Sequence, residues 1–411
     1  MRLVLILAVF LCLVPPAAAD SVPVIDNPRE APRVNDQHFE EVWRAGADES
    51  EDFIFGVIRA VVSDAHRNIY LLDSQQQQVF KFSPAGKYLG LVSRKGEGPG
   101  EINLAYHLHS PGEGRIAIQK AFPARIVLVD TAGTPLPGIS LTVTATAGKE
   151  PGFPSLRGVA FEGNHLVAAG SIMHNDGVIQ DNTSFVARFD LEGNEVHRYA
   201  QWASGYDFSQ PITVHEEEKF QPFDDWDMDA AGRVYHLVER EDYLVQVDGP
   251  DGAPLFRIRR AWPVHKRSDE EKEKAKSNFS FSSNHGLPPI SYDMADTDPA
   301  IYSLAVMGDE LWVTSTEQRR TRPAEIPRTV SVFDLEGHLV EERNFHFPYD
   351  RGEDLIRYLP DGRVVRIKAF FSANAAASAS HTIQTGEKIR GEKDFDEEAV
   401  LEVVVYRPVS P

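Results

Sequence analysis

The stretch Asp64-Ala-His-Arg-Asn-Ile-Tyr-Leu-Leu-Asp73 joins a polar turn to a short apolar strand. Val79-Phe-Lys-Phe82 then forms a second candidate strand, which ends at a hairpin around Gly86. Short runs of β-branched, aromatic and aliphatic residues bounded by Asp, Asn and Gly are typical of antiparallel β-strands. The same order of turn, strand, strand and glycine hairpin recurs along the chain, so the sequence predicts a repeated β unit.

Five further copies follow the first. Their paired strands lie at 115–118 with 126–133, 165–168 with 185–193, 233–236 with 244–252, 311–313 with 330–337, and 361–365 with 400–406. An apolar segment precedes each turn and another follows each hairpin, for example 56–62 and 87–92. Four antiparallel strands per unit make a propeller blade. The sequence therefore predicts an all-β fold, a six-bladed β-propeller that forms a single domain over residues 38–411.

The sixth copy ends right after its third strand and lacks an outer strand of its own. Ahead of the first copy, Phe39-Glu-Glu-Val-Trp-Arg44 is a strand-like segment without another assignment. A ring of sheets avoids an exposed edge when the two chain ends share one blade. We therefore expect this N-terminal strand to complete the last blade and close the ring. Residues 20–37, with Pro23, Pro28 and Pro32, predict an extended lead-in.

The first 19 residues have the organisation of a secretory signal peptide. Arg2 precedes the apolar run 3–14, and Ala17-Ala18-Ala19 supplies the small residues of a cleavage site. Cys12 is the single cysteine, and its large neighbours disfavour the alternative of lipid attachment. The sequence predicts an exported protein, periplasmic or extracellular, with no disulfide, no transmembrane segment and a monomeric state. A net charge of −20 disfavours binding to nucleic acid.

One copy resembles a known group, the six-bladed propellers of the NHL-repeat type, which are related in architecture to TolB-like propellers. The resemblance is carried by Asn68-Ile-Tyr-Leu-Leu-Asp73, by 79–82 with 86–89, and by the loop Gly96-Glu-Gly-Pro-Gly-Glu-Ile102. It implies the fold and an extracytoplasmic binding platform. It implies no particular activity.

Several motifs have a structural interpretation rather than a catalytic one. In the loop 96–100, Pro99 removes a backbone donor and no Gly-Lys-Ser/Thr follows, so we interpret the loop as a turn between blades. Ser268-Asp-Glu-Glu271 predicts the capped start of a short exposed helix. Aspartates recur at turns, where their side chains bind backbone amides: Asp73, Asp130, Asp190, Asp248 and Asp334.

No catalytic or compact metal-binding motif is identifiable. The 14 histidines show no His-Glu-x-x-His arrangement, and no Gly-x-Ser-x-Gly elbow is present. We predict no catalytic residue and no cofactor. A calcium or zinc ion held in the central channel by side chains from several blades stays open.

Long connections fall on one face of the predicted ring, at about 169–184, 202–223, 263–299, 315–329 and 370–398. Long loops in compact domains are usually functional or disordered. Aromatic, histidine, acidic and arginine side chains in these connections are the candidate binding residues: Tyr206, His215, His285, Tyr292, Asp293, Asp296, Arg319, Arg320 and Arg322.

Two functions from different classes follow. The first is a non-enzymatic propeller that binds a protein, peptide or glycan through the long-loop face and the central channel. The alternative is a metal-dependent hydrolase or lyase, of lactonase-like type, with its ion in the channel. The missing catalytic signature favours binding.

Overall fold

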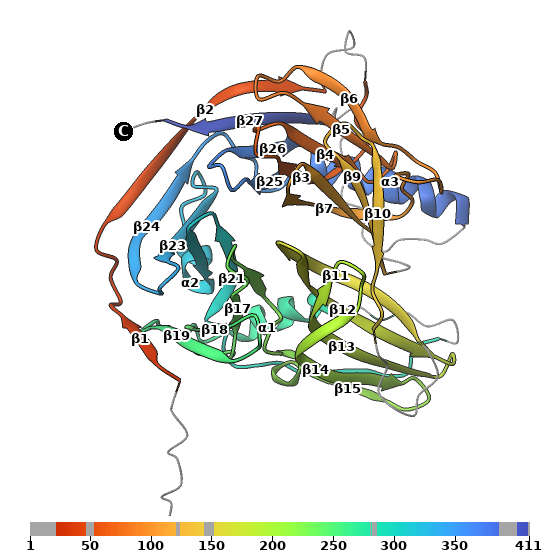
Figure 1. Cartoon of the computed structure of the whole chain (residues 1–411). Coiled ribbons are helices and arrows are strands. Elements are labelled where there is room, and N and C mark those ends of the chain that lie inside the picture. Colours follow the sequence, from red (N-terminus) through yellow and green to blue (C-terminus); the bar gives the residue numbers. More distant parts are fainter. Residues whose placement is uncertain are drawn as a thin grey trace, which may run out of the picture.

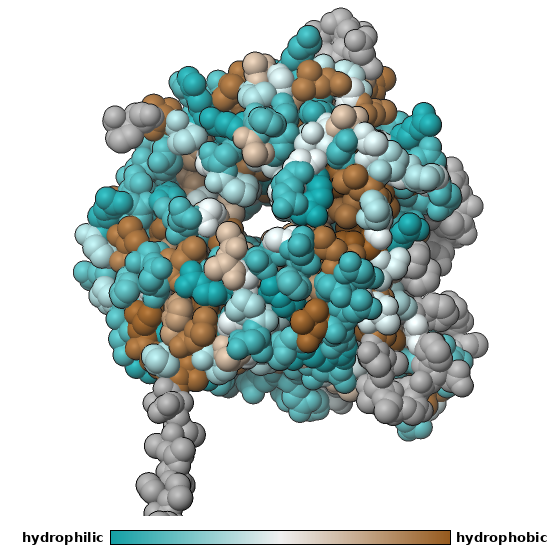
Figure 2. Space-filling model, in the orientation of Figure 1, coloured by the Kyte–Doolittle hydropathy of each residue, from teal (hydrophilic) through white to brown (hydrophobic). Residues whose placement is uncertain are grey.

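Most of the chain folds into antiparallel sheets arranged around a central opening (Figure 1). The computed structural model describes residues 22–46, 53–120, 124–143, 152–279, 281, 286–385 and 401–409. The opening is also visible at the centre of the space-filling view (Figure 2). This arrangement of four-stranded sheets is that of a β-propeller.

The first three sheets each contain four strands that are consecutive in the chain. They are β3–β6 (Ile58–Ser63, Ile69–Asp73, Gln78–Phe82, Tyr88–Ser93), β7–β10 (Ala105–Gly112, Arg115–Lys120, Arg125–Asp130, Pro135–Ser140) and β11–β14 (Phe153–Glu162, His165–Asn175, Ile179–Asp190, Glu195–Asp207).

The later units keep the same antiparallel order. They are β16–β19 (Trp226–Met228, Val234–Leu237, Leu244–Asp248, Pro254–Arg260), β21–β24 (Ile301–Met307, Glu310–Ser315, Arg328–Asp334, Leu339–His346) and β25–β27 (Leu355–Tyr358, Val364–Lys368, Glu402–Pro408). The second and third strands predicted for each copy are confirmed.

The N-terminal strand β2 (Val34–Ala45) pairs with two different units. Its second half runs antiparallel to β27, from Phe39 opposite Pro408 to Ala45 opposite Val403, so the predicted pairing of this segment with the last strand is confirmed. Its first half runs parallel to β24.

Of the lead-in predicted for residues 20–37, the described part, residues 22–37, pairs with other strands and is not a free tail. Strand β1 (Val24–Asn27) pairs in parallel with β19. Asn27 also accepts a hydrogen bond from the Leu339 amide across 2.7 Å and donates one to the Gly337 carbonyl across 2.9 Å. The segment therefore contacts two neighbouring units along their outer edge.

The core consists of the faces on which neighbouring sheets pack. One cluster joins residues of the first unit, such as Ile69 and Phe82, to residues of the last, such as Val365 and Val403. Burial of such side chains is the main stabilising contribution in a protein with this composition.

Most of the recurring aspartates act as turn caps. Asp130, Asp190 and Asp334 each accept a hydrogen bond from the backbone amide four residues later, at 2.7 to 2.8 Å. Asp73 accepts from the Gly56 amide across 2.6 Å as well as from the amides of its own turn. Asp248 differs, because it is buried and contacts Nε2 of His236 at 3.0 Å.

The connections between strands carry the remaining elements. The helix predicted after Ser268 is confirmed as α1 (Asp269–Ala275), with the Ser268–Glu271 capping box present. The others are α2 (Thr316–Thr321), α3 (Phe370–Thr385), the 3-10 turns η1 (Glu217–Lys219) and η2 (Lys276–Asn278), and the parallel pair β15 (Ile212–His215) and β20 (Ile290–Asp293).

One predicted insertion was wrong. Residues 169–184 are not a long loop, because β12 and β13 pair continuously from His165 opposite Asp190 to Asn175 opposite Gln180. A short turn at 176–178 joins them. The segment 202–223 likewise begins as strand, since β14 extends to Asp207.

Candidate functional site: an arginine-lined cavity

A cavity of about 760 Å³ lies between the β21–β24 unit and the β25–β27 unit. Its wall is formed by the first residues of β21, by β22, by α2 and the start of β23, by the turn after β24, by β25 and by the start of α3. Five arginines and three tyrosines face it: Arg319, Arg320, Arg322, Arg328, Arg351, Tyr302, Tyr349 and Tyr358. We call it the arginine cavity.

Helix α2 carries two of these arginines and is fixed at its N-terminus. The Gln318 amide donates to Oγ of Ser315 across 3.0 Å, and the Ser315 amide donates to Oε1 of Gln318 across 2.9 Å. This reciprocal capping box satisfies two amides that a helix start leaves free. Gln318 is buried and also donates to Oγ of Ser331 on β23 across 3.0 Å. The following residues, Arg319 and Arg320, therefore project from a fixed turn.

Two arginines of the cavity lie over aromatic rings. The guanidinium of Arg319 is 4.1 Å from the ring centroid of Tyr302, whose side chain is exposed. The guanidinium of Arg328 is 4.9 Å from the ring centroid of Tyr358. Cation–π contacts of this kind orient a guanidinium while leaving its N–H groups free for another partner.

Arg322 occupies an unfavourable position for a cation. Its Nε is buried and has no hydrogen-bond partner among the described residues. Burial lowers the pKa of Arg322, and the positive charge of Arg351 acts in the same direction. Burial also lowers the pKa of Arg328. The cavity thus holds positive charge at some cost in solvation.

Few carboxylates balance this charge. Among the described residues, no ion pair is found for Arg319, Arg322, Arg328 or Arg351. Arg320 is paired with Glu271 of α1 at 2.7 Å and with Asp298 at 3.5 Å. The one carboxylate in the described wall, Asp354, is engaged by Arg366 at 2.6 Å.

An ionic network holds the surrounding connections together. Arg267 donates to Glu216 across 2.6 Å and to Asp298 across 2.5 Å, and all three side chains are largely buried. Asp298 continues to Arg320, and Arg320 to Glu271. Connections that precede β16, β21 and β23 are therefore joined beside the cavity.

The other predicted site residues lie outside the cavity wall. His215 and Asp293 face each other across the β15–β20 pair, with Nδ1 to Oδ2 at 3.0 Å. The ring centroid of Tyr292 on β20 is 6.3 Å from that of Phe279. The predicted face is therefore divided into the arginine cavity and a group around β15 and β20.

Two further residues contact lysines, and one cannot be placed. The Tyr206 ring lies 4.8 Å from Nζ of Lys219. Asp296 accepts a hydrogen bond from Lys272 of α1. The predicted residue His285 lies outside the described residues.

Two carboxylates at the start of the β16–β19 unit bind the first strand of the next unit. Asp225 accepts from the Leu304 amide across 2.6 Å, and Asp227 from the Val306 amide across 2.8 Å, so both bind the inner strand of the next unit. Burial raises the pKa of Asp225 to about 7 and that of Asp227 to about 6. In the described part of the chain, no group of three or more His, Cys, Asp or Glu side chains is placed to hold a metal ion.

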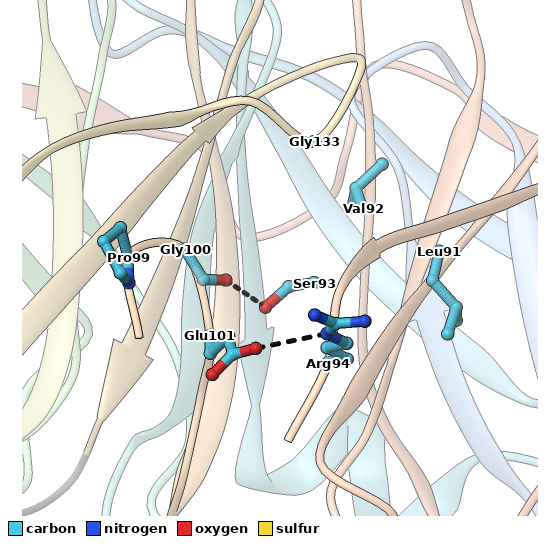
Figure 3. A pocket seen from close by; sticks show the side chains of 8 residues that line it. All are labelled: Leu91, Val92, Ser93, Arg94, Pro99, Gly100, Glu101 and Gly133. Atoms are coloured by element: carbon cyan, nitrogen blue, oxygen red, sulfur yellow. Dashed lines mark hydrogen bonds and ion pairs between the residues drawn. The ribbon is translucent and has the colours of Figure 1, made fainter. Parts of the chain in front are cut away.

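The glycine-rich loop after β6 is confirmed as a turn between units (Figure 3). Its surroundings form a second cavity of about 360 Å³. Inside the loop, Glu101 accepts from the Gly98 amide across 3.0 Å and from Nε of Arg94 across 3.1 Å. Ser93 donates to the Gly100 carbonyl across 2.6 Å. Because a carboxylate of the chain already uses the loop, it is not a phosphate cradle.

The sequence prediction missed five residues of the arginine cavity: Tyr302, Arg328, Tyr349, Arg351 and Tyr358. Arg328 lies within the predicted connection 315–329 but was not selected. The other four lie on strand ends or in the turn after β24, outside the long connections that the prediction considered. One signal was available. Four arginines occur within the ten residues 319–328 of a chain with 42 basic and 62 acidic residues.

Comparisons with known proteins give no family. No family model matches the chain, and no curated protein does. Among the residues described, no helix is long and apolar enough to cross a membrane.

Solved structures with a similar course of the chain include a DUF4221-family protein from Bacteroides vulgatus, with 10% identity, 92% of this chain and 99% of that chain covered, and a TM-score of 0.45. A calcium-binding regucalcin from Agrobacterium tumefaciens shows 10% identity, coverage of 92% and 96%, and a TM-score of 0.40. A gluconolactonase from Xanthomonas campestris shows 14% identity, coverage of 86% and 88%, and a TM-score of 0.37. Likeness at this level carries no argument about function.

Proposed function

We propose that this chain is an exported, six-bladed, NHL-like β-propeller that binds a ligand in the arginine cavity. On this proposal the six blades are the six units described above. Two of them, β21–β24 and β25–β27, are joined in one sheet by β2, which supplies the fourth strand beside β27 and closes the ring. The signal-peptide pattern of residues 1–19 supports export to the periplasm or the exterior. On this proposal the protein acts by binding and needs no catalytic residue.

One observation carries the proposal. A cavity of about 760 Å³ lies where two blades meet, and three of the binding residues predicted from the sequence, Arg319, Arg320 and Arg322, line it. Its volume falls in the usual range of small-molecule sites, roughly 300–1,000 Å³. A ligand of this size, such as a short glycan or peptide, fits better than a folded protein partner.

The described residues do not favour the alternative of a metal-dependent hydrolase or lyase. Asp225 and Asp227, two described carboxylates with raised pKa values, accept hydrogen bonds from backbone amides of β21. No described cluster favours that alternative.

Ligand screening tests the proposal. Purified mature protein is screened by thermal shift against neutral, anionic and cationic sugars, peptides and metabolites. We expect a hit that stabilises the wild type but not Tyr302→Ala, which removes the ring beneath Arg319. Lys87→Ala and Glu336→Ala, at exposed turns of the opposite face, should respond like the wild type. Equal stabilisation of Tyr302→Ala, or loss of the response in the control variants, would overturn the proposal.

A further inference from the structure

The arginine cavity concentrates positive charge with few carboxylates near it. Asp225 acts electrostatically on Arg328 but forms no ion pair with it. Arg319, Arg322, Arg328 and Arg351 have no ion pair among the described residues, although the whole chain carries a net charge of −20. Elsewhere in the structure, arginines are commonly paired, as Arg267 is with Glu216 and Asp298. Unpaired cations in a shared cavity repel one another, so an anion that enters it gains from all of them.

The side chain of Arg322 indicates where an acceptor atom of the ligand would lie. A buried N–H without an acceptor is costly, and native structures rarely keep one without a reason. Nε of Arg322 is such a group among the described residues. Guanidinium groups match carboxylate, sulfate and phosphate oxygens in a planar, two-pronged geometry. An oxyanion of the ligand would supply the missing acceptor.

The remaining wall residues indicate the chemistry of the uncharged part of the ligand. Tyr302, Ile356 and Phe371 contribute ring and aliphatic surface beside the arginines. A bare inorganic ion would leave most of the cavity and this surface unused. A compact molecule with a ring or apolar body satisfies both parts of the wall.

We propose that the ligand of the arginine cavity is a small polyanion, a molecule with two or more carboxylate, sulfate or phosphate groups on a compact ring or apolar body. This inference rests on the proposed function, since it names the chemical class that the same cavity takes. Arg322 and Arg328 would contact the anionic groups, and Tyr302 the body. Arg320 would stay with Glu271 and act as a positioning residue.

Isothermal titration with four defined probes tests the inference. Digalacturonate and citrate carry carboxylates, with and without a sugar ring, pyrophosphate carries phosphates, and cellobiose is a neutral disaccharide. We expect digalacturonate to bind most tightly, with an affinity that falls as salt is raised from 50 to 300 mM. Tighter binding of pyrophosphate than of digalacturonate would contradict the inference, because pyrophosphate has no ring or apolar body.

Variants connect the binding to the cavity. Arg322→Gln and Arg328→Gln should each weaken binding of the polyanion at least tenfold. Lys87→Gln removes one positive charge from an exposed turn on the opposite face and should leave the affinity within twofold. Arg322→Met should raise the melting temperature of the ligand-free protein, because it removes an unpaired buried donor while keeping an elongated side chain.

The outcomes separate the inference from the proposed function. If cellobiose binds, is lost in Tyr302→Ala and is unaffected by Arg322→Gln, the cavity binds a ligand but the inference is wrong. If none of the three polyanions binds with a Kd below about 1 mM, the inference is also wrong. If polyanions bind equally to wild type and to both arginine variants, the ligand lies elsewhere and both proposals fail.

Discussion

Trp43 of β2 stacks on Phe82 of β5, with ring centroids 5.4 Å apart and planes inclined by 21°. The contact connects the two ends of the repeat array, because β2 pairs with β27 of the last unit while Phe82 belongs to the first. Trp43 is buried, with 8% of its surface exposed. Replacing it with alanine should cost about 3 kcal/mol of unfolding free energy through the cavity left behind. Chemical denaturation measures this cost, and a change below about 1 kcal/mol would contradict the role of the contact.

Deletion of residues 20–45 should lower the melting temperature of the whole protein in one cooperative transition. It removes the pairing of β2 with β27 and leaves a strand edge exposed. Deletion of residues 20–31 is the matched control, because it removes β1 but keeps β2, and its effect should be smaller. Equal melting temperatures for the wild type and the longer deletion would exclude β2 as the closing strand.

Glu216→Gln should destabilise the protein by roughly 3 kcal/mol, because it leaves the buried Arg267 with half of its ionic partners. Glu270→Gln, at an exposed position of α1, is the control and should change stability by less than about 0.5 kcal/mol. The measurement is equilibrium unfolding in urea. Similar values for the two variants would show that the network contributes little beyond surface charge.

The repeat strands were predictable because the apolar residues that mark them in the sequence are the same residues that the fold buries. Apolar runs such as 69–72 are fully buried, and the aspartate and glycine turns around them are local. The pairing of β2 with β27 was predictable by elimination, since the last copy lacked an outer strand. The pairing of β1 with β19 was not predictable, because it joins in parallel two segments more than 200 residues apart in the chain and follows no turn signal.

The long hairpin β12–β13 occupies a segment, 169–184, that was predicted as a long connection. Beyond Ala169 its strands carry Ser, Thr, Asn and Asp, residue types that are also common in loops. Asn175-Asp176-Gly177 is nevertheless a strong hairpin signal, and Oδ1 of Asp176 accepts from the amides of residues 178 and 179. The turn signal was more informative than the composition.

The site was predictable only in part. Arg319, Arg320 and Arg322 were found because they lie in a long connection. Tyr302 was not, since a strand residue is ordinarily assigned to packing, and Arg328 was passed over although it lies in the same connection. Their place in the cavity depends on how two blades meet, which no local pattern specifies.

Asp225 should make the protein less stable at pH 8 than at pH 5. Its folded-state pKa is raised by burial to about 7 from the model-compound value of 3.8, so the folded protein binds this proton more tightly than the unfolded chain does. Stability contributed by the group is therefore present below pH 3.8 and falls as the pH rises towards 7, by about 2 kcal/mol between pH 5 and pH 8.

Asp225→Asn isolates this effect, since an amide oxygen still accepts from the Leu304 amide but does not titrate. The difference in unfolding free energy between wild type and variant should change with pH over this interval. A difference that is constant from pH 5 to pH 8 would contradict the raised pKa.

Gly86 offers a test of close packing at the junction of the chain ends. It adopts φ +83°, and a Cβ added there would lie 2.5 Å from Cγ of Trp43. Gly112 has the same φ of +83°, but an added Cβ would meet no atom within 4 Å. Both alanine variants therefore carry the same backbone strain, about 1 kcal/mol. Only Gly86→Ala also has to displace Trp43, which is buried and stacked on Phe82. This variant should therefore lose about 1–2 kcal/mol more unfolding free energy than Gly112→Ala. Equilibrium unfolding of the two variants side by side measures the difference. If Gly112→Ala is as destabilising as Gly86→Ala, the backbone conformation alone explains both, and Trp43 is not packed tightly against the first unit.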